Sequence, residues 1–340
     1  MKILQVMAGD DNGGAETFFL DAIKAVAETE HMQSVITRAN NDYKVDQIKQ
    51  RNIPLKEAVF SNFFRYPTQK IIKNTIEEFK PDIVHHYMGR AGSYAVPGIH
   101  VNIGWYGGYY NPERFKHCNH HVAVTQDIAD HIVKQGVREE NVHVLHIYAE
   151  FKKAQPLNRA EFDTPDNVPV LLSLSRLHTK KGLDVLLNAM MQLPEAYLWI
   201  AGSGPLEREL KQQTKSLNIE NRVRFLGWRN DREALLETCD ICVFPSRYEP
   251  FGAVVIEAWA TEKPLVTAKA AGPKAYVQNE ENGLIVEIDD VDALAHAIRR
   301  VIDDKELREN IIKNGKKDYD ENFTKEVFKR NVIELYNRIL

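Results

Sequence analysis

The chain has 340 residues, of which 44% are hydrophobic, and this length fits two domains that each bury a core. Its 44 Lys and Arg and 48 Asp and Glu give a formal net charge of −4 without a long basic block, which argues against general nucleic-acid binding. Three cysteines indicate a reducing compartment rather than a disulfide framework, and no apolar run is long enough for a membrane span or a signal peptide. We therefore expect a cytoplasmic protein.

Apolar runs alternate with helical patterns in the first half, which is typical of a parallel sheet covered by helices. The pattern predicts strands over 2–7, 33–37, 57–60, 82–86, 101–105, 121–125 and 142–147, and helices over 14–29, 66–79 and 126–136. Gly13 and Gly14 follow the first strand and by themselves indicate only a turn. Lysines, prolines and aspartates interrupt the pattern over 148–168, which we interpret as a linker.

Residues 56–73 interleave aromatic with cationic side chains, and two interpretations stay open. In the first, the segment rests on anionic lipid headgroups as a peripheral contact. In the second, Phe60 and the isoleucines belong to the core, and Phe63, Phe64 and Tyr66 line a cleft.

Residues 117–121, with the sequence His-Cys-Asn-His-His, contain good zinc ligands. Neighbouring residues on a strand point to opposite faces, so at most part of this cluster can converge on one ion. We therefore expect packed or surface histidines and no metal site.

The second half predicts another parallel sheet. Its strands are expected over 169–175, 197–201, 222–226, 241–244, 264–267 and 284–286, and its helices over 182–192, 205–216, 231–238, 252–261, 291–303 and 305–317. From 324 to 340 apolar residues recur at helical spacing, which predicts an amphipathic terminal helix.

Two glutamates, Glu249 and Glu257, follow the strand predicted over 241–244. Ligands of open α/β sheets bind at the carboxyl ends of strands. Pro250 pushes Glu249 into an extended conformation, whereas Glu257 falls on the helix beyond, so both acids can face one pocket. This spacing suits recognition of sugar hydroxyls better than hydrolysis by a close carboxylate pair, and the alternative is two solvated surface glutamates.

Two cations follow the strand predicted over 169–175. Arg176 stands at the strand end and Lys181 at the start of the next helix, where they can form a clamp for a diphosphate. Gly202 and Gly204, after the strand over 197–201, allow the backbone to approach a ligand closely. The alternative for the two cations is an exposed position without function.

Together, these segments resemble the retaining nucleotide-sugar glycosyltransferases of family four. The resemblance rests on Pro245-Ser246 with the paired glutamates around Phe251-Gly252, and on the stretch from Arg176 to Lys181. It implies an α/β protein of the GT-B fold, with two facing Rossmann-like domains and an interdomain cleft. The first domain, 1–150 with a crossover helix over 322–340, is expected on the acceptor side, and 165–320 is expected to bind the nucleotide sugar.

The resemblance also implies roles for single residues. Arg176, Lys181 and Glu249 are the expected catalytic residues: the cations hold the diphosphate, and the glutamate binds hydroxyls of the transferred sugar. Glu257 is expected to bind the ribose, and backbone amides at the helix start to bind an anion. The implied donor-binding residues are Gly13, Gly14, Gly202, Gly204, Leu226, Phe251, Gly252, Ala253, Val254 and Glu257.

Two positions depart from the family pattern. Tyr106 stands where relatives carry a histidine that touches the transferred sugar, and His85, His86 or His100 could replace that histidine on the acceptor side. Ala275 stands where relatives carry a glutamate, whose role we interpret as bracing of the local loop.

The resulting hypothesis is a retaining, metal-independent hexosyltransferase that needs no cofactor. It would transfer sugar from a UDP- or GDP-sugar to a glycan or lipid-linked acceptor in bacterial cell-surface polysaccharide or lipopolysaccharide biosynthesis. In the first interpretation of residues 56–73, this segment would contact the cytoplasmic face of the inner membrane. A sugar-nucleotide epimerase on the same fold and a catalytically silent binding or scaffold protein remain as alternatives.

Overall fold

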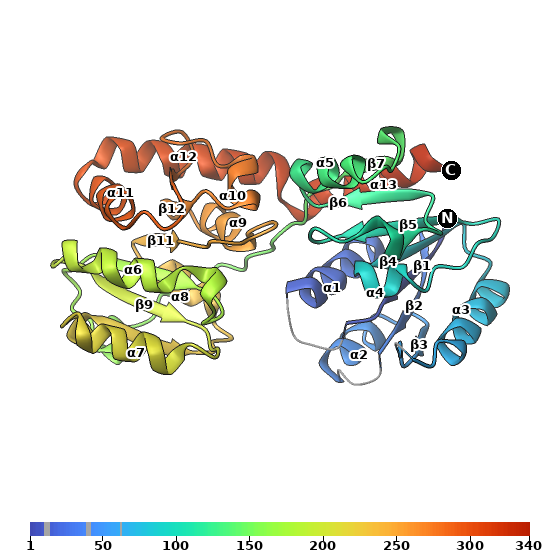
Figure 1. Cartoon of the computed structure of the whole chain (residues 1–340), viewed down its shortest axis with the longest axis horizontal. Helices are drawn as coiled ribbons and strands as arrows, with labels where there is room; N and C mark the ends of the chain where they lie inside the picture. The colour runs from blue at the N-terminus through green and yellow to red at the C-terminus, as the bar shows by residue number, and fades with distance from the viewer. Residues whose placement is uncertain (10–13, 39–41, 62) are drawn as a thin grey trace. The chain divides into compact units, whose positions relative to one another are not determined.

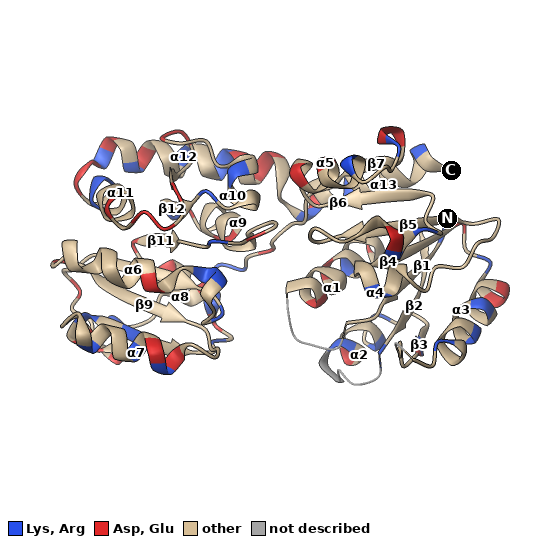
Figure 2. Ribbon diagram, viewed as in Figure 1, with Lys and Arg blue, Asp and Glu red and all other residues tan. Residues whose placement is uncertain are grey.

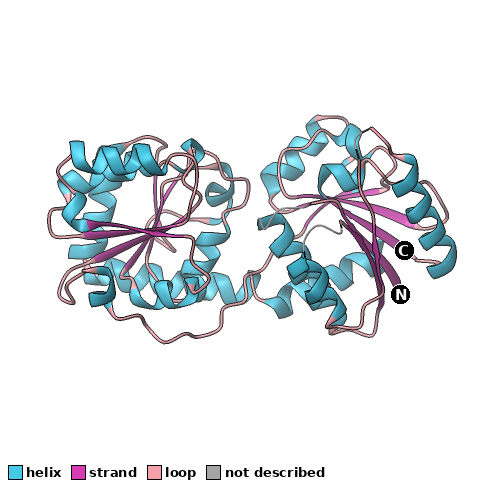
Figure 3. Cartoon of the chain, turned by 90° about the horizontal axis from the view of Figure 1, so that it is seen from below, coloured by secondary structure: helices cyan, strands magenta, loops and turns pink. Residues whose placement is uncertain are grey.

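The chain forms two compact units, each built around one parallel sheet. The computed structural model describes residues 1–9, 14–38, 42–61 and 63–340, so the expectation for Gly13 lies outside the described residues. Unit 1 comprises Met1–Tyr148 and Lys325–Leu340, and unit 2 comprises Ala149–Thr324 (Figure 1). In both units helices cover the two faces of the sheet (Figure 3).

The sheet of unit 1 has the strand order β3-β2-β1-β4-β5-β6-β7, so the order reverses beside β1. All neighbours pair in parallel. The strands are β1 (Lys2–Met7), β2 (Met32–Thr37), β3 (Leu55–Glu57), β4 (Ile83–Tyr87), β5 (Val101–Tyr106), β6 (His120–Ala123) and β7 (Val142–Val144). The helices are α1 (Gly14–Ala27), α2 (Asp42–Lys49), α3 (Tyr66–Phe79), α4 (Met88–Gly92), α5 (Gln126–Lys134) and α13 (Lys325–Ile339).

One predicted strand of unit 1 was placed wrongly. The apolar run Ala58 to Phe60 suggested a strand over 57–60, but β3 ends at Glu57. Phe60 adopts a left-handed conformation with φ of 50°, which turns the chain, while its side chain is completely buried. Burial rather than strand pairing therefore explains these apolar residues.

Helix α13 contributes to the core of unit 1. Its Phe328 ring lies 5.7 Å from that of Phe18 and 5.2 Å from that of Tyr148, measured between centroids. Lys325 and Lys329 of the same helix pair with Glu28 at 2.8 and 3.4 Å. The amphipathic pattern of the sequence thus corresponds to a buried aromatic face and a charged flank.

The sheet of unit 2 has the order β10-β9-β8-β11-β12-β13 and reverses beside β8. Its strands are β8 (Val170–Leu174), β9 (Tyr197–Ala201), β10 (Val223–Gly227), β11 (Ile241–Phe244), β12 (Leu265–Ala268) and β13 (Leu284–Val286). Its helices are α6 (Leu183–Ala189), α7 (Glu207–Ser216), α8 (Arg232–Thr238), α9 (Ala253–Ala260), α10 (Ala271–Tyr276), α11 (Val291–Asp303) and α12 (Lys305–Asn322). Figure 2 shows both signs of charge interspersed along α11 and α12.

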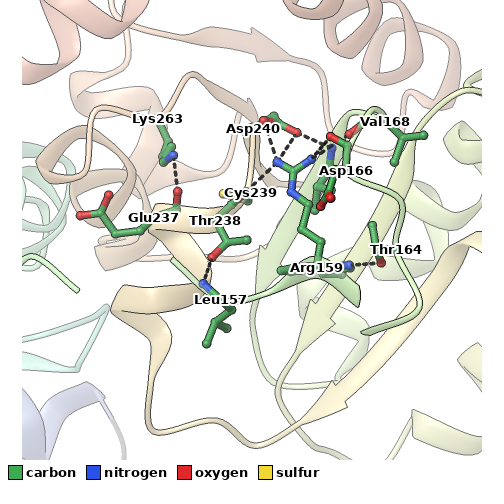
Figure 4. Close-up of polar contacts among 12 residues, drawn as sticks. Leu157, Arg159, Thr164, Asp166, Val168, Glu237, Thr238, Cys239, Asp240 and Lys263 are labelled. Carbon is green, nitrogen blue, oxygen red and sulfur yellow. Dashed lines mark hydrogen bonds and ion pairs between the residues drawn. The ribbon is translucent and has the colours of Figure 1, made fainter. Parts of the chain in front are cut away.

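The segment interpreted as a linker packs against the amino ends of the strands of unit 2. Apart from the short 3-10 helix η3 (Arg159–Phe162), it is irregular. Arg159 Nη2 lies 3.0 and 2.9 Å from the two carboxylate oxygens of Asp240 and 2.9 Å from the carbonyl oxygen of Thr238 (Figure 4). Asp240 also accepts a hydrogen bond from the amide of Val170, the first residue of β8.

Among the described residues, no helix combines the length and the apolar character that crossing a membrane requires.

Candidate functional site

The candidate site lies at the carboxyl edge of the unit 2 sheet, between β8 and β11. The strand order reverses there, and ligands of open α/β sheets bind in the crevice that forms at such a point. The chain leaves β8 toward Arg176 and Lys181 and leaves β11 toward Glu249. The topology thus brings together the two segments that the sequence singled out.

Lys181 and Glu249 form an ion pair at this edge. Lys181 Nζ lies 2.5 Å from Glu249 Oε2, and the side chains are 21% and 18% exposed. The ammonium group also lies 5.6 Å from the centroid of the Phe244 ring. The pair is therefore mostly shielded from water but still reachable, so an incoming anion can share the ammonium group.

The backbone around Lys181 packs directly on the loop after β11. Lys181 ends the 3-10 helix η4 (Thr179–Lys181), and Gly182 follows it with φ of 63°. A Cβ atom at Gly182 would lie 2.0 Å from the carbonyl oxygen of Pro245, so only glycine fits this position. The sequence pattern alone does not indicate this close contact.

Arg176 follows β8 at the same edge and is exposed. Its guanidinium group forms no ion pair and no hydrogen bond with any residue that the structure describes. Its charge is thus not committed to a carboxylate, in contrast to that of Lys181. The structure gives no direct contact between Arg176 and the Lys181–Glu249 pair.

Glu257 lies apart from that pair, on helix α9. Its side chain is 4% exposed, and its Oε1 accepts a hydrogen bond of 2.9 Å from Arg232 Nη1. Burial raises the pKa of Glu257, and the positive charge of Arg232 opposes this shift. Sequence reasoning missed Arg232, which starts helix α8 and carries no motif signal of its own.

The start of α9 offers backbone amides without a side-chain cap. Gly252 precedes the helix with φ of 91°, and no side chain caps this end among the described residues. The first amides of a helix have no partner within it, so they are available to an anion. Ala253 and Val254 begin this helix, whereas Phe251 is buried.

Helix α10 braces the Glu249 loop. The amide of Gly272 donates to the carbonyl oxygen of Glu249 at 2.7 Å, and the Tyr276 hydroxyl donates to the carbonyl oxygen of Phe251. The sequence predicted neither this helix nor this contact. Tyr276, which follows Ala275 in the sequence, therefore holds the backbone of this loop at Phe251.

The remaining residues that the sequence predicts to bind the donor are Gly202, Gly204, Leu226 and Gly14, and packing of the protein's own backbone explains two of them. A Cβ atom at Gly202 would lie 1.9 Å from the Ser175 carbonyl oxygen, and one at Gly204 would lie 2.4 Å from that of Leu177. The protein's own backbone therefore requires both glycines. Leu226 is a half-buried residue of β10, and Gly14 is the exposed first residue of α1 in unit 1.

The three residues expected on the acceptor side are all buried. His85 and His86 have no exposed surface, and burial lowers their pKa values to about 3 and about 4. His85 Nδ1 is hydrogen-bonded to the Tyr336 hydroxyl, and His86 Nε2 to Asn102 Oδ1, both at 2.9 Å. These contacts make both imidazoles part of the core, which leaves an acceptor role without support in the structure.

Tyr106 is also completely buried. Its ring stacks on that of Phe115 at 4.1 Å, and its hydroxyl is hydrogen-bonded to His121 Nδ1 at 2.9 Å. His120, on the opposite face of β6, is hydrogen-bonded to His143 at 3.0 Å. Among the described residues, no group of three His, Cys, Asp or Glu side chains is placed to hold a metal ion.

Residues 56–73 divide into a buried and an exposed set. Phe60 and Ile72 are completely buried, which confirms their expected place in the core, and the partly buried Ile71 packs against the same core. Phe63, Phe64 and Tyr66 are 91%, 77% and 73% exposed. The aromatic residues that the sequence placed either in a cleft or on a lipid surface are therefore open to solvent.

Comparisons with known proteins identify related sequences for both units. The family model described as Glycosyl transferases group 1 matches residues 154–318, and that described as Glycosyltransferase Family 4 matches residues 12–147. The lipopolysaccharide core biosynthesis glycosyltransferase LpsE of Rhizobium meliloti is 30% identical over 342 residues, which cover 98% of each chain.

Solved structures share the fold of the full chain. The Anabaena protein Alr3699/HepE in complex with UDP superposes with a TM-score of 0.87 at 23% identity, over 99% of this chain and 100% of the other. The same protein in complex with UDP-glucose gives a TM-score of 0.84 at 24% identity, with the same coverage.

Proposed function

Since the chain belongs to the group 1 glycosyltransferases and has the GT-B fold that its sequence predicted, we propose that it is a retaining enzyme that uses a nucleoside diphosphate sugar. The sugar would pass to a hydroxyl group of a glycan or glycolipid. Unit 2 would bind the donor, and unit 1 would hold the acceptor.

The observation that carries this proposal is the Lys181–Glu249 pair at the point where the sheet order reverses. A diphosphate needs a cation beside it, and a sugar needs hydrogen-bond acceptors for its hydroxyl groups. A partly exposed ammonium group 2.5 Å from a carboxylate offers both within one site. The complexes of Alr3699/HepE with UDP and UDP-glucose support a uridine donor.

The proposed chemistry needs charge stabilisation more than a nucleophile. As the bond between the sugar carbon and the phosphate oxygen breaks, negative charge grows on the diphosphate, and Lys181 and Arg176 offset it. The acceptor oxygen bonds to the same face of the sugar carbon, and the leaving phosphate oxygen takes the acceptor's proton. Glu249 and the amides of Ala253 and Val254 orient the donor. No cofactor enters this step.

We extend the proposal to the ribose. Glu257 would bind its hydroxyl groups by sharing its carboxylate with Arg232. Replacement of Glu257 by glutamine is expected to weaken binding of UDP, as measured by titration calorimetry.

A donor screen tests the proposal. Purified protein is incubated with UDP-glucose, UDP-galactose and GDP-mannose, with and without truncated lipopolysaccharide, and release of nucleoside diphosphate is measured. We expect release from one donor that depends on the acceptor. A changed sugar without an acceptor would indicate an epimerase, and neither binding nor turnover of any donor would indicate a silent binding protein.

The Lys181→Ala variant tests the role of the cation. We expect its turnover to fall by about 100- to 1000-fold, because one transition-state contact is lost. Lys211→Ala, which removes a lysine from the surface helix α7, serves as the control. An unchanged rate in Lys181→Ala would refute the clamp.

The setting we propose is bacterial cell-surface polysaccharide or lipopolysaccharide biosynthesis, at the cytoplasmic face of the membrane. The relationship to the lipopolysaccharide core enzyme of Rhizobium meliloti supports it. Phe63, Phe64 and Tyr66 would enter the headgroup region, with the exposed Lys70 and Lys73 of α3 facing anionic lipids.

Sedimentation with vesicles tests this contact. We expect binding to vesicles that contain phosphatidylglycerol and weaker binding to neutral ones. The double variant Phe63→Ser, Phe64→Ser should lose binding, whereas Met191→Ser, which removes an exposed apolar side chain of unit 2, should retain it. Equal binding of both variants would exclude the segment as the contact.

A further inference from the structure

We propose that Arg247 is a positioning residue, which clamps the loop that carries Glu249 to the turn that carries Lys181. The inference rests on the proposed function for its catalytic consequence, because it concerns the same ion pair. The guanidinium group of Arg247 binds carboxylates outside that pair, those of Asp184 and Asp289.

The Arg247 guanidinium group binds three separate segments. Nη1 and Nη2 donate to the two carboxylate oxygens of Asp184 at 2.8 and 2.6 Å, in a bidentate arrangement. Nε donates to Asp289 Oδ1 at 2.5 Å, and Nη1 also donates to the carbonyl oxygen of Thr179 at 2.7 Å. A planar fork can satisfy all these acceptors at once, whereas a lysine cannot.

The backbone of the same residue holds the same turn. The amides of Arg247 and Tyr248 donate to the carbonyl oxygen of Lys180 at 2.9 and 3.2 Å. The Lys180 ammonium group lies 4.5 Å from the centroid of the Tyr248 ring. The turn over 179–182 and the loop over 245–249 are thus joined on both sides of Lys181.

The electrostatics support a stable clamp. Burial acts to raise the pKa of Asp184, but hydrogen bonds and the charge of Arg247 outweigh it, so the pKa is lowered. The Arg247 side chain is 28% exposed, and those of Asp184 and Asp289 are 43% and 53% exposed. Bidentate geometry and two further acceptors, Asp289 Oδ1 and the Thr179 carbonyl oxygen, distinguish this group from an ordinary surface ion pair.

A catalytic consequence follows from the position of the clamp. Arg247 lies two residues before Glu249, and Asp184 lies three residues after Lys181. Without the clamp, the two segments can shift relative to each other, and the distance from Lys181 to Glu249 is no longer fixed. Misplacement of a catalytic contact by about 1 Å can cost about 100-fold in rate.

The chain provides a matched control at the opposite edge of the same sheet. Arg159 also binds both oxygens of an aspartate, Asp240, and also donates to backbone carbonyl oxygens (Figure 4). It lies near the amino ends of the strands, away from Lys181. A purely structural role for Arg247 predicts that Arg247→Lys and Arg159→Lys have similar effects.

Hydrogen exchange and kinetics of Arg247→Lys and Arg159→Lys test the proposal. In Arg247→Lys we expect faster exchange of the amides of residues 247 and 248, and a kcat for UDP-sugar turnover that falls by about 10- to 100-fold with a smaller change in KM. Arg159→Lys should retain both the exchange rates of these amides and kcat. In the Lys181→Ala background, Arg247→Lys should reduce kcat little further.

Two outcomes would overturn the proposal. Unchanged exchange of residues 247 and 248 in Arg247→Lys would show that there is no clamp, whatever the enzyme catalyses. Equal losses of kcat in Arg247→Lys and Arg159→Lys would show that the loss reflects a general decrease in stability and not the position of Lys181 and Glu249. A wild-type protein that turns over no nucleotide sugar would refute the proposed function instead, and the exchange measurement would still decide whether the clamp exists.

Discussion

Because Gly182 has no side chain, two loops of unit 2 can approach each other closely. Gly182 combines a left-handed conformation with contact to the Pro245 carbonyl oxygen, and the adjacent Lys181 depends on that contact for its position. Residues of this kind act through the backbone, because they determine how closely neighbouring segments can pack. Gly272, whose Cβ would lie 2.2 Å from the Phe251 carbonyl oxygen, belongs to the same group.

Replacement of Gly182 by alanine should therefore destabilise the protein beyond the cost of its conformation. A left-handed alanine costs about 1–2 kcal/mol, and the clash with Pro245 adds about 1–3 kcal/mol. Gly227→Ala is the control, because Gly227 has a similar φ of 66° and a Cβ there would meet nothing within 4 Å. Chemical denaturation of both variants measures the difference, and equal losses would contradict the close contact.

The buried imidazole of His121 predicts that the folded protein loses stability in acid. Burial, with a smaller contribution from His120, lowers the pKa of His121 from 6.5 to about 4. The unfolded chain binds this proton below about pH 6.5, but the folded protein binds it only below about pH 4. Protons thus favour unfolding in this window, so the stability present above pH 6.5 falls as the pH approaches 4.

The variant His121→Gln removes this titration but retains an acceptor for the Tyr106 hydroxyl. We expect the denaturation midpoint in urea to fall less between pH 7 and pH 5 in His121→Gln than in the wild type. The same pH dependence in both proteins would show that His121 does not contribute to the acid sensitivity.

At the scale of the elements, most strands of both sheets were predictable from sequence because each is a short apolar run bounded by breakers. The failures have specific causes. Helix α10 contains Gly272 and Pro273, which usually mark a turn, and α4 contains two glycines in five residues. Helix α2 has only Val45 and Ile48 as aliphatic residues, which is too few for a period.

Only part of the candidate site could be predicted from the sequence. Lys181 and Glu249 carry a motif, and the topology brings them together. Arg247, Arg232 and Tyr276 act through contacts that are remote in sequence, and no spacing rule indicates them. His85, His86 and Tyr106 lie at or near strand ends, and that position does not by itself indicate whether a side chain is buried.

The packing of helix α13 gives a prediction at this scale. Phe328 is 2% exposed and contacts the rings of Phe18, Trp105 and Tyr148. We expect Phe328→Ala to lower the free energy of unfolding by about 3–5 kcal/mol. Phe63→Ala, at a position 91% exposed, should change it by less than about 0.5 kcal/mol in the same denaturation experiment.

At the scale of the whole molecule, the two units differ in how the chain builds them. Unit 2 is a single continuous segment, Ala149–Thr324, whereas unit 1 needs Met1–Tyr148 together with Lys325–Leu340. The interior of unit 1 includes contacts to the last segment, such as that between His85 and Tyr336.

Removal of residues 325–340 should therefore affect the units unequally. We expect amides of β4 and β5 to lose protection from hydrogen exchange, because Phe328 and Tyr336 no longer cover the rings of Trp105 and His85. Amides of β8, β9 and β11 should retain their protection. A uniform loss across the chain would contradict the independence of the unit 2 core.

The split composition of unit 1 has a consequence for biosynthesis. A ribosome delivers the first seven strands early, but the helix that closes over them emerges only after every residue of unit 2 has been made. Unit 1, although it is translated first, can therefore complete its core only after unit 2, and the rings of Phe18 and Trp105 lack their contact with Phe328 until then. Nascent unit 1 is therefore the part of this chain that we expect a chaperone for exposed apolar surface to bind.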